Sequence, residues 1–139
     1  MIDVELMVGW IIKHPKREDA FPGWPDEQIA RIVLEHIRDN ELLLITTRED
    51  ENKIYGILLY SVNDNEHIIR IQHILANSTD TFKAFLTIWY TYYSTYDLIG
   101  SRGRKERRYT VRNFQKLLRK DDTPYHVTES SDNKLLVNN

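Results

Sequence analysis

The segment 75–82 joins a predicted strand to a predicted helix, and joints of this kind often hold phosphate groups. The first turn of a helix offers backbone N–H groups without partners and a partial positive charge. Phosphate-binding joints usually contain glycine, which lets the backbone come close to the ligand. Residues 76–80 read Ala-Asn-Ser-Thr-Asp, without glycine. The hydroxyls of Ser78, Thr79 and Thr81 are the candidate cofactor ligands, although an N-cap explains Ser78 or Thr79 better.

A second candidate for binding an anion is the basic segment 102–120. It contains nine Lys and Arg residues and one acid, a net charge of +8 in a chain whose total is −2. Arg102, Gly103 and Arg104 combine guanidinium groups, which suit phosphate, with a relaxed backbone. This pattern predicts a localised anionic partner, such as a nucleotide or a nucleic-acid backbone. The alternative is a solvated face whose charges interact with acids of the same fold.

His73 is the candidate for acid–base catalysis, because a side-chain pKa of about 6.5 suits a base near neutral pH. A single histidine in a strand is, however, more often structural. The five histidines lack the close spacing of metal ligands, and the chain has no cysteine, so we expect neither a metal site nor thiol chemistry. Gly-x-Ser-x-Gly and phosphate-loop patterns are also missing, which leaves hydrolase and nucleotidase functions without support.

Hydrophobic spacing predicts the elements that position these residues. In order they are two helices, three strands, an aromatic-rich helix, a short strand, a further helix and a terminal hairpin. Short polar turns between the three strands indicate an antiparallel meander. A helix between the third and fourth strands predicts that those two strands are parallel. The approximate bounds are 4–14, 25–40, 42–47, 54–62, 68–75, 79–93, 97–100, 109–118 and 125–137.

Three local features carry further predictions. The continuous apolar run 42–47 predicts a strand covered on both faces. Gly56 predicts a bulge or a close approach of another segment. The loop 21–25, Phe-Pro-Gly-Trp-Pro, is predicted to be rigid and to expose Phe21 and Trp24.

Length and composition indicate one soluble α/β domain over residues 1–139. The apolar share of 41% and the charged share of 29% are typical of globular proteins. No apolar run approaches the ~20 residues that span a bilayer, so we expect no membrane contact. Residues 2–12 contain two acids and lack a basic start, unlike a secretory signal. The expected location is cytoplasmic or within a virion.

This order of elements resembles the GNAT superfamily of acyl-CoA-dependent N-acyltransferases. In that fold two helices precede a meander, the central helix follows the fourth strand, and the fifth strand splays from the fourth to admit the pantetheine arm. The resemblance covers residues ~2–137 and rests on topology and hydrophobic pattern. It implies a mixed sheet flanked by helices, in which a parallel crossover follows the meander. Residues 2–12 read as helix, so we expect the chain to begin after the family's first strand.

The departures from the family lie at its functional positions. Its cofactor motif, Arg/Gln-x-x-Gly-x-Gly/Ala, falls at 77–82, where glycine is missing and Asp80 adds a negative charge. The position of the family's tyrosine acid falls near Lys120. Some relatives use a glutamate on the fourth strand, and this chain offers Gln72 and His73 there.

These departures favour a degenerate, phage-type GNAT-like domain that has lost acyl-CoA catalysis. Such a domain needs no cofactor and serves a structural or interaction role in a phage virion or other assembly, as a homo-oligomer or with a protein partner. The first alternative is an active N-acetyltransferase, with acetyl-CoA as cofactor, His73 as base, and Phe21 and Trp24 near the acceptor. The second is nucleic-acid binding through the basic residues 102–112.

Overall fold

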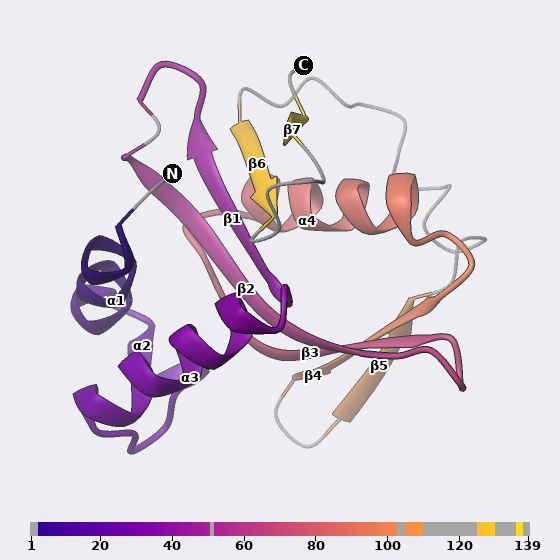
Figure 1. Cartoon of the computed structure of the whole chain (residues 1–139), viewed down its shortest axis with the longest axis horizontal. Helices are drawn as coiled ribbons and strands as arrows, with labels where there is room; N and C mark the ends of the chain where they lie inside the picture. The colour runs from indigo at the N-terminus through magenta and orange to yellow at the C-terminus, as the bar shows by residue number, and fades with distance from the viewer. Residues whose placement is uncertain (1–2, 51, 103–104, 110–124, 130–135, 138–139) are drawn as a thin grey trace.

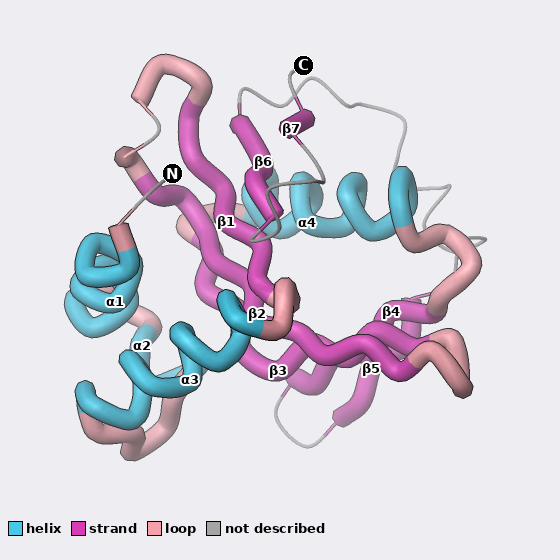
Figure 2. Tube along the Cα trace, viewed as in Figure 1, coloured by secondary structure: helices cyan, strands magenta, loops and turns pink. Residues whose placement is uncertain are grey.

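The computed structural model describes residues 3–50, 52–102, 105–109, 125–129 and 136–137. Its strands form one sheet in the order β5-β4-β3-β2-β1-β6-β7. Figures 1 and 2 show α4 on one face of the sheet and α1, α2 and α3 together on the other. The elements are α1 (Val4–Lys13), α2 (Arg17–Ala20), α3 (Asp26–Arg38), β1 (Leu42–Thr47), β2 (Ile54–Asn63), β3 (Ile68–Ala76), α4 (Thr79–Tyr92), β4 (Asp97–Arg102), β5 (Lys105–Tyr109), β6 (Tyr125–Glu129) and β7 (Leu136–Val137).

Apolar side chains on both faces of β1 and β2 account for the three layers. Leu42 and Leu44 pack with the side chains of α1 and α3, whereas Leu43 and Ile45 pack with those of α4. Successive residues of a strand point to opposite faces, so an uninterrupted apolar run supplies both cores at once. The predicted strand covered on both faces is confirmed.

The meander and the crossover match their predictions. β1, β2 and β3 pair antiparallel, and β3 and β4, which α4 connects, pair in parallel. The parallel pairing covers only Ile68–Arg70 against Asp97–Ile99. Beyond it, β3 continues to Ala76 and β4 to Arg102 without further pairing between the two strands. A mixed α+β sheet flanked by helices is therefore confirmed.

The region after β4 differs from its prediction. Residues 105–109 form β5, which pairs antiparallel with β4, and Tyr109 lies opposite Leu98. The predicted basic loop and the helix start at Tyr109 are therefore wrong, while residues 110–118 lie outside the described part. Lys105, Arg107 and Arg108 stand on a strand at the sheet edge, where positive charge discourages pairing with other chains.

The terminal hairpin is confirmed, and the structure also shows which strand it pairs with, which was not predicted. β6 and β7 pair antiparallel, and β6 pairs antiparallel with β1. The hairpin therefore extends the sheet beyond β1, at the opposite end from β5. Among the described strands, the edges of the sheet are thus β5 on one side and β7 on the other.

An extra residue in β3 sets the direction of His73. Leu59 lies opposite His73 and Tyr60 lies opposite Ile71, so Gln72 is left without a partner in the register. A bulge of this kind reverses the alternation of faces. Before it, Ile71 packs against the α4 side, and after it Leu75 packs among α1–α3. His73 shares the face of Leu75.

Gly56 of β2 marks the predicted close approach. A Cβ atom at Gly56 would lie 2.5 Å from Cγ2 of Thr81 and 3.2 Å from both the Leu75 carbonyl oxygen and Cε2 of Phe85. The first turn of α4 therefore packs directly on the backbone of β2. The absence of a side chain at this position lets a helix, rather than a ligand, approach the sheet.

Candidate functional site at the start of α4

The start of α4 is capped by its own residues. Ser78 is the N-cap, and its Oγ accepts a hydrogen bond from the Thr81 backbone N–H at 3.3 Å. Oγ1 of Thr81 lies 3.2 Å from the same oxygen, and Thr81 is fully buried. The predicted cap is confirmed. The hydroxyls of Ser78 and Thr81 thus bond to each other, whereas Thr79 lies exposed on the surface.

Asp80 occupies the first turn of α4 and is exposed. A carboxylate at this position interacts favourably with the positive end of the helix. The same carboxylate repels a phosphate that approaches the first turn. The helix end is therefore complemented by the chain's own negative charge.

A line of hydrogen bonds fixes the side chain of Asn77, which precedes the cap. The Lys16 backbone N–H donates to Nδ1 of His14 at 3.1 Å, so this nitrogen carries a lone pair. The proton of the neutral ring is then on Nε2, which donates to Oδ1 of Asn77 at 2.8 Å. The Asn77 backbone N–H donates to the carbonyl of Tyr55 at 3.0 Å. Both the backbone and the amide oxygen of Asn77 are thus held by the protein.

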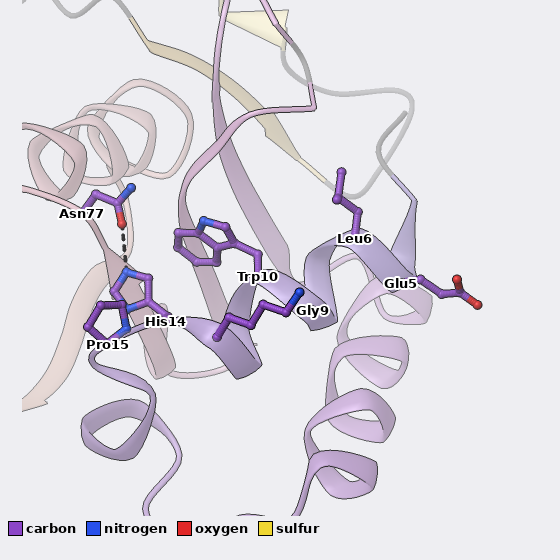
Figure 3. Close-up of a pocket in the computed structure, with 8 residues that line it drawn as sticks. Glu5, Leu6, Gly9, Trp10, His14, Pro15 and Asn77 are labelled. Atoms are coloured by element: carbon purple, nitrogen blue, oxygen red, sulfur yellow. Dashed lines mark hydrogen bonds between the residues drawn. The ribbon is translucent and has the colours of Figure 1, made fainter.

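A pocket of 490 Å³ opens beside Asn77, along one face of α1. Figure 3 shows Trp10 between Leu6 on one side and His14 and Asn77 on the other, with Glu5 at the far end. The Trp10 and His14 ring centroids are 4.8 Å apart. The lining residues are Glu5, Leu6, Gly9, Trp10, Lys13, His14, Pro15 and Asn77.

The sequence does not predict this pocket, because His14 and Asn77 are 63 positions apart. One local signal for it exists. Gly9 lies in the middle of α1 between apolar residues, and a Cβ atom there would meet nothing within 4 Å. The glycine therefore leaves open space beside Trp10.

His73, on β3, contacts the segment that contains α2. Its Nδ1 lies 2.7 Å from the carbonyl oxygen of Ala20, so this nitrogen is the donor. Its ring stacks on Phe21 with centroids 4.2 Å apart and 13° between planes, and meets Trp24 edge-on at 4.9 Å. His73 does not line the pocket of α1. These contacts describe a residue that fastens α2 to the sheet.

The loop around Phe21 differs from its prediction. Phe21 is 0% exposed and belongs to the core between the sheet and α1–α3, so its predicted exposure is wrong. Trp24 is half-buried and packs against the same core. The unpredicted helix α2 turns the chain so that Phe21 points inward. There its ring stacks on one face of the His73 ring, which the bulge at Gln72 directs to this side of the sheet.

Burial lowers the pKa of His73 below its usual range, and repulsion from a protonated His36 adds to this. The hydrogen bond to Ala20 opposes the change only partly. In the unfolded chain His73 takes up a proton at the ordinary pKa of about 6.5. Hence its neutral form favours the folded state above that pH, and this stability is lost as the pH falls from there to the lower pKa of the folded state.

We therefore expect the free energy of unfolding to fall more steeply with acidification in the wild type than in His73→Gln. Glutamine removes the titrating group and retains a side-chain N–H donor. Urea denaturation at about pH 8 and about pH 5.5 measures both proteins. If the free energy of unfolding fell by the same amount in both proteins between these two pH values, the fold would not favour the neutral form of His73.

The basic residues at the other candidate site are divided between described and undescribed positions. Arg102 ends β4 opposite Lys105, whereas Gly103 and Arg104 lie outside the described residues. Lys105, Arg107 and Arg108 are exposed. Nucleic-acid binding through 102–112 stays a prediction.

Two ion pairs tie β5 to β4, its neighbour in the sheet, and to β3, the next strand along. A guanidinium nitrogen of Arg108 lies 2.6 Å from Oδ2 of Asp97, and Glu106 pairs with Arg70 at 2.8 Å. Part of the basic segment thus interacts with acids of the same fold, as the alternative predicts. Because these pairs are exposed, each contributes only about 0–1 kcal/mol.

Within the described ranges, no group of three or more potential metal ligands comes together, and no helix is long and apolar enough to cross a membrane. Comparisons of the chain with models of protein families, with curated proteins and with solved structures give no match.

Proposed function

We propose that this chain is a GNAT-like domain that has lost acyl-CoA catalysis and serves a structural or interaction role, as in a phage virion or another assembly. The observation that carries this proposal is the start of α4, which Ser78 caps, which lacks glycine and which carries Asp80 in its first turn. A cofactor pyrophosphate needs free backbone N–H groups and a close approach at such a joint. Here Thr81 N–H donates to Ser78, and Asn77 N–H donates to Tyr55.

Electrostatics at the joint also support the absence of cofactor binding. Asp80 is exposed in the first turn, and no glycine relaxes the segment 76–80. A pyrophosphate placed there would meet the carboxylate at the only end of α4 that favours anions. The helix is therefore stabilised by the residue that repels the ligand.

The contacts of His73 agree with a structural role. Its Nδ1–H is used by the Ala20 carbonyl, and Phe21 covers one face of its ring. A residue that fastens two elements in this way explains its burial without any reaction.

An exposed polar face of the sheet supports an interaction role. Ser61 and Gln72 are joined by a hydrogen bond of 3.0 Å on the side of the sheet away from α4. Arg70 and Arg108 lie beside Ile99 in the register on the same side. Ile99 is only 2% exposed, whereas Arg70, Gln72 and Arg108 are exposed. A face of this kind offers hydrogen-bond and charged groups to a protein partner.

An active acyl-CoA-dependent N-acetyltransferase is the second candidate, and the divergence of β3 and β4 favours it. The two strands stop pairing after Arg70 and Ile99, which resembles the opening that admits the pantetheine arm in GNAT enzymes. A neutral His73 with a lone pair on Nε2 would supply the base. The two candidates thus differ in whether acetyl-CoA binds.

Acetyl-CoA in large excess is expected to change neither the Tm nor the backbone amide signals of residues 77–83. Binding at a concentration 100 times the Kd would stabilise the fold by about 2.7 kcal/mol, which raises the Tm measurably. The experiment is a thermal melt together with ¹⁵N-resolved NMR on the full chain. A saturable shift at 77–83 would refute the proposal and establish the enzyme candidate, provided that His73→Gln then abolishes turnover.

A further inference from the structure

The edge strand β5 has one side of its backbone open. Among the described strands its only neighbour in the sheet is β4. Alternate residues of an edge strand direct their backbone N–H and C=O groups away from the sheet, where an extended chain can add as a further strand. Figure 1 shows β5 apart from α1, α2 and α3, at the opposite end of the sheet from β6 and β7. The backbone of β5 can thus accept a further strand.

The charged side chains of β5 are divided between the two faces of the sheet. Glu106 and Arg108 lie on the side away from α4, where they form ion pairs of 2.8 Å with β3 and 2.6 Å with β4. Lys105 and Arg107 alternate with them along the strand and so lie on the opposite face. Both are exposed, and neither forms an ion pair with another described residue. The fold therefore neutralises the charges on one face of β5 and leaves two positive charges on the other.

The spacing of these two charges indicates the chemistry of a partner. Lys105 and Arg107 are two residues apart in an extended strand, about 6.6 Å. Residues directly opposite each other in paired strands have Cβ atoms about 4.5–5.5 Å apart, and opposite charges at this distance are favourable. A strand with an acidic residue at every second position therefore places one carboxylate opposite each cation while its backbone pairs with β5.

Other occupants suit this edge less well. An antiparallel pair of two β5 strands that overlap over all five residues would place Arg107 directly opposite Arg107, and like charges there are destabilising. A nucleic acid would use the two cations alone, because it has no peptide groups with which to continue the sheet. The open backbone and the unpaired charges together favour an acidic peptide.

We propose that the open edge of β5 binds an acidic, extended segment of a protein partner, which adds to the sheet as a strand and sets alternate carboxylates against Lys105 and Arg107. Positive charge on an edge discourages pairing with apolar strands, and the same charge selects an acidic one. The proposal goes beyond the function proposed above. It concerns the sheet edge, so binding of acetyl-CoA at the start of α4 would neither support nor contradict it.

The probe is the peptide acetyl-Thr-Glu-Val-Glu-Thr-Glu-Val-amide, titrated into the ¹⁵N-labelled full chain. The matched control peptide carries glutamine in place of each glutamate. We expect saturable shifts of the backbone amides of residues 105–109, and binding of the glutamine peptide about five- to tenfold weaker, as two exposed cross-strand charge pairs can provide. We also expect slower hydrogen exchange at alternate amides of 105–109 in the complex, because strand addition, unlike charge attraction alone, gives these N–H groups an acceptor.

Charge reversal tests the two cations directly. The variant Lys105→Glu/Arg107→Glu should lose binding of the glutamate peptide and bind a peptide with lysine at the same positions, which also shows that the variant is folded. Lys16→Glu/Arg31→Glu changes two exposed cations of the helical layer by the same total charge. This control should bind the glutamate peptide like the wild type at physiological salt, where charges beyond about 8 Å are screened.

A single-stranded oligonucleotide of deoxythymidine tests the other class of partner, and we expect it to leave the hydrogen exchange of residues 105–109 unchanged. Equal affinity for the glutamate and glutamine peptides, unchanged hydrogen exchange at saturation with the glutamate peptide, or equal loss of binding in the control variant would each overturn the proposal. Shifts of these amides with the oligonucleotide and not with the glutamate peptide would assign the edge to nucleic acid and overturn it as well.

Discussion

Replacing Phe21 by alanine is expected to lower the free energy of unfolding by about 3–5 kcal/mol, as is usual for truncating a fully buried phenylalanine. Phe21 is 0% exposed and its ring lies 4.2 Å from that of His73. A domain of this size has about 5–15 kcal/mol in total, so the loss is a large share of its stability. Urea denaturation of the variant and the wild type measures it.

The same substitution should also change His73, because Phe21 covers one face of its ring. With less burial, the pKa of His73 should rise toward its usual value, which an NMR titration of the ring signals can follow. Leu34→Ala, at a side chain that is 53% exposed, is the control and should stay within about 0.5 kcal/mol of the wild type. A cost for Phe21→Ala as small as that of the control would contradict the burial of this loop.

Gly56→Ala is expected to destabilise the fold by about 1–3 kcal/mol through overpacking. The new methyl group would lie 2.5 Å from Cγ2 of Thr81, so the first turn of α4 must move away from β2. Gly9→Ala is the matched control, since its Cβ meets nothing within 4 Å and alanine favours a helix by about 0.5–1 kcal/mol. The two glycine substitutions should thus have opposite signs in the same urea denaturation experiment.

Thr81→Ser provides the internal test of this explanation. It removes the clashing Cγ2 and keeps the hydroxyl that lies 3.2 Å from Ser78 Oγ. The double variant Gly56→Ala/Thr81→Ser should therefore be more stable than the sum of the single effects, by a coupling of about 0.5–3 kcal/mol. Rescue should remain partial, because the Leu75 carbonyl and Phe85 still crowd the new methyl group. Additive effects would show that the strain lies elsewhere.

The periodic parts of the fold were predictable because their neighbours follow closely in the chain. The run 42–47 predicted a strand with two covered faces, and the short turns after it predicted the meander. The helical crossover predicted the parallel pairing of β3 and β4. In each case the alternation of apolar residues, which is local, decides the outcome.

The irregular parts depend on contacts between distant residues. No local signal separates a helix from an edge strand at Tyr109, which adopts the strand because Leu98 pairs with it. The bulge at Gln72 matters because it turns His73 toward Phe21, and Phe21 is buried only because α2 brings it there. Propensities could predict neither contact.

The candidate site shows the same division. Ser78 as an N-cap follows from its type and place before a helix, so it was predictable and is confirmed. The pocket of α1 depends on the bond between His14 and Asn77, whose polarity is set by the Lys16 N–H. That arrangement arises only when α1 meets the β3–α4 joint.

The pairing of β1 with β6 has a consequence for how the sheet assembles during synthesis. Leu43 lies opposite Glu129, 86 positions later in the chain. Until β6 has emerged from the ribosome, β1, in which five of six residues are buried in the folded protein, has one unpaired edge, a template for association with other chains. Contacts of such long sequence separation also slow folding. The period between the synthesis of β1 and that of β6 is therefore when the nascent chain is most exposed to aggregation and most in need of a chaperone.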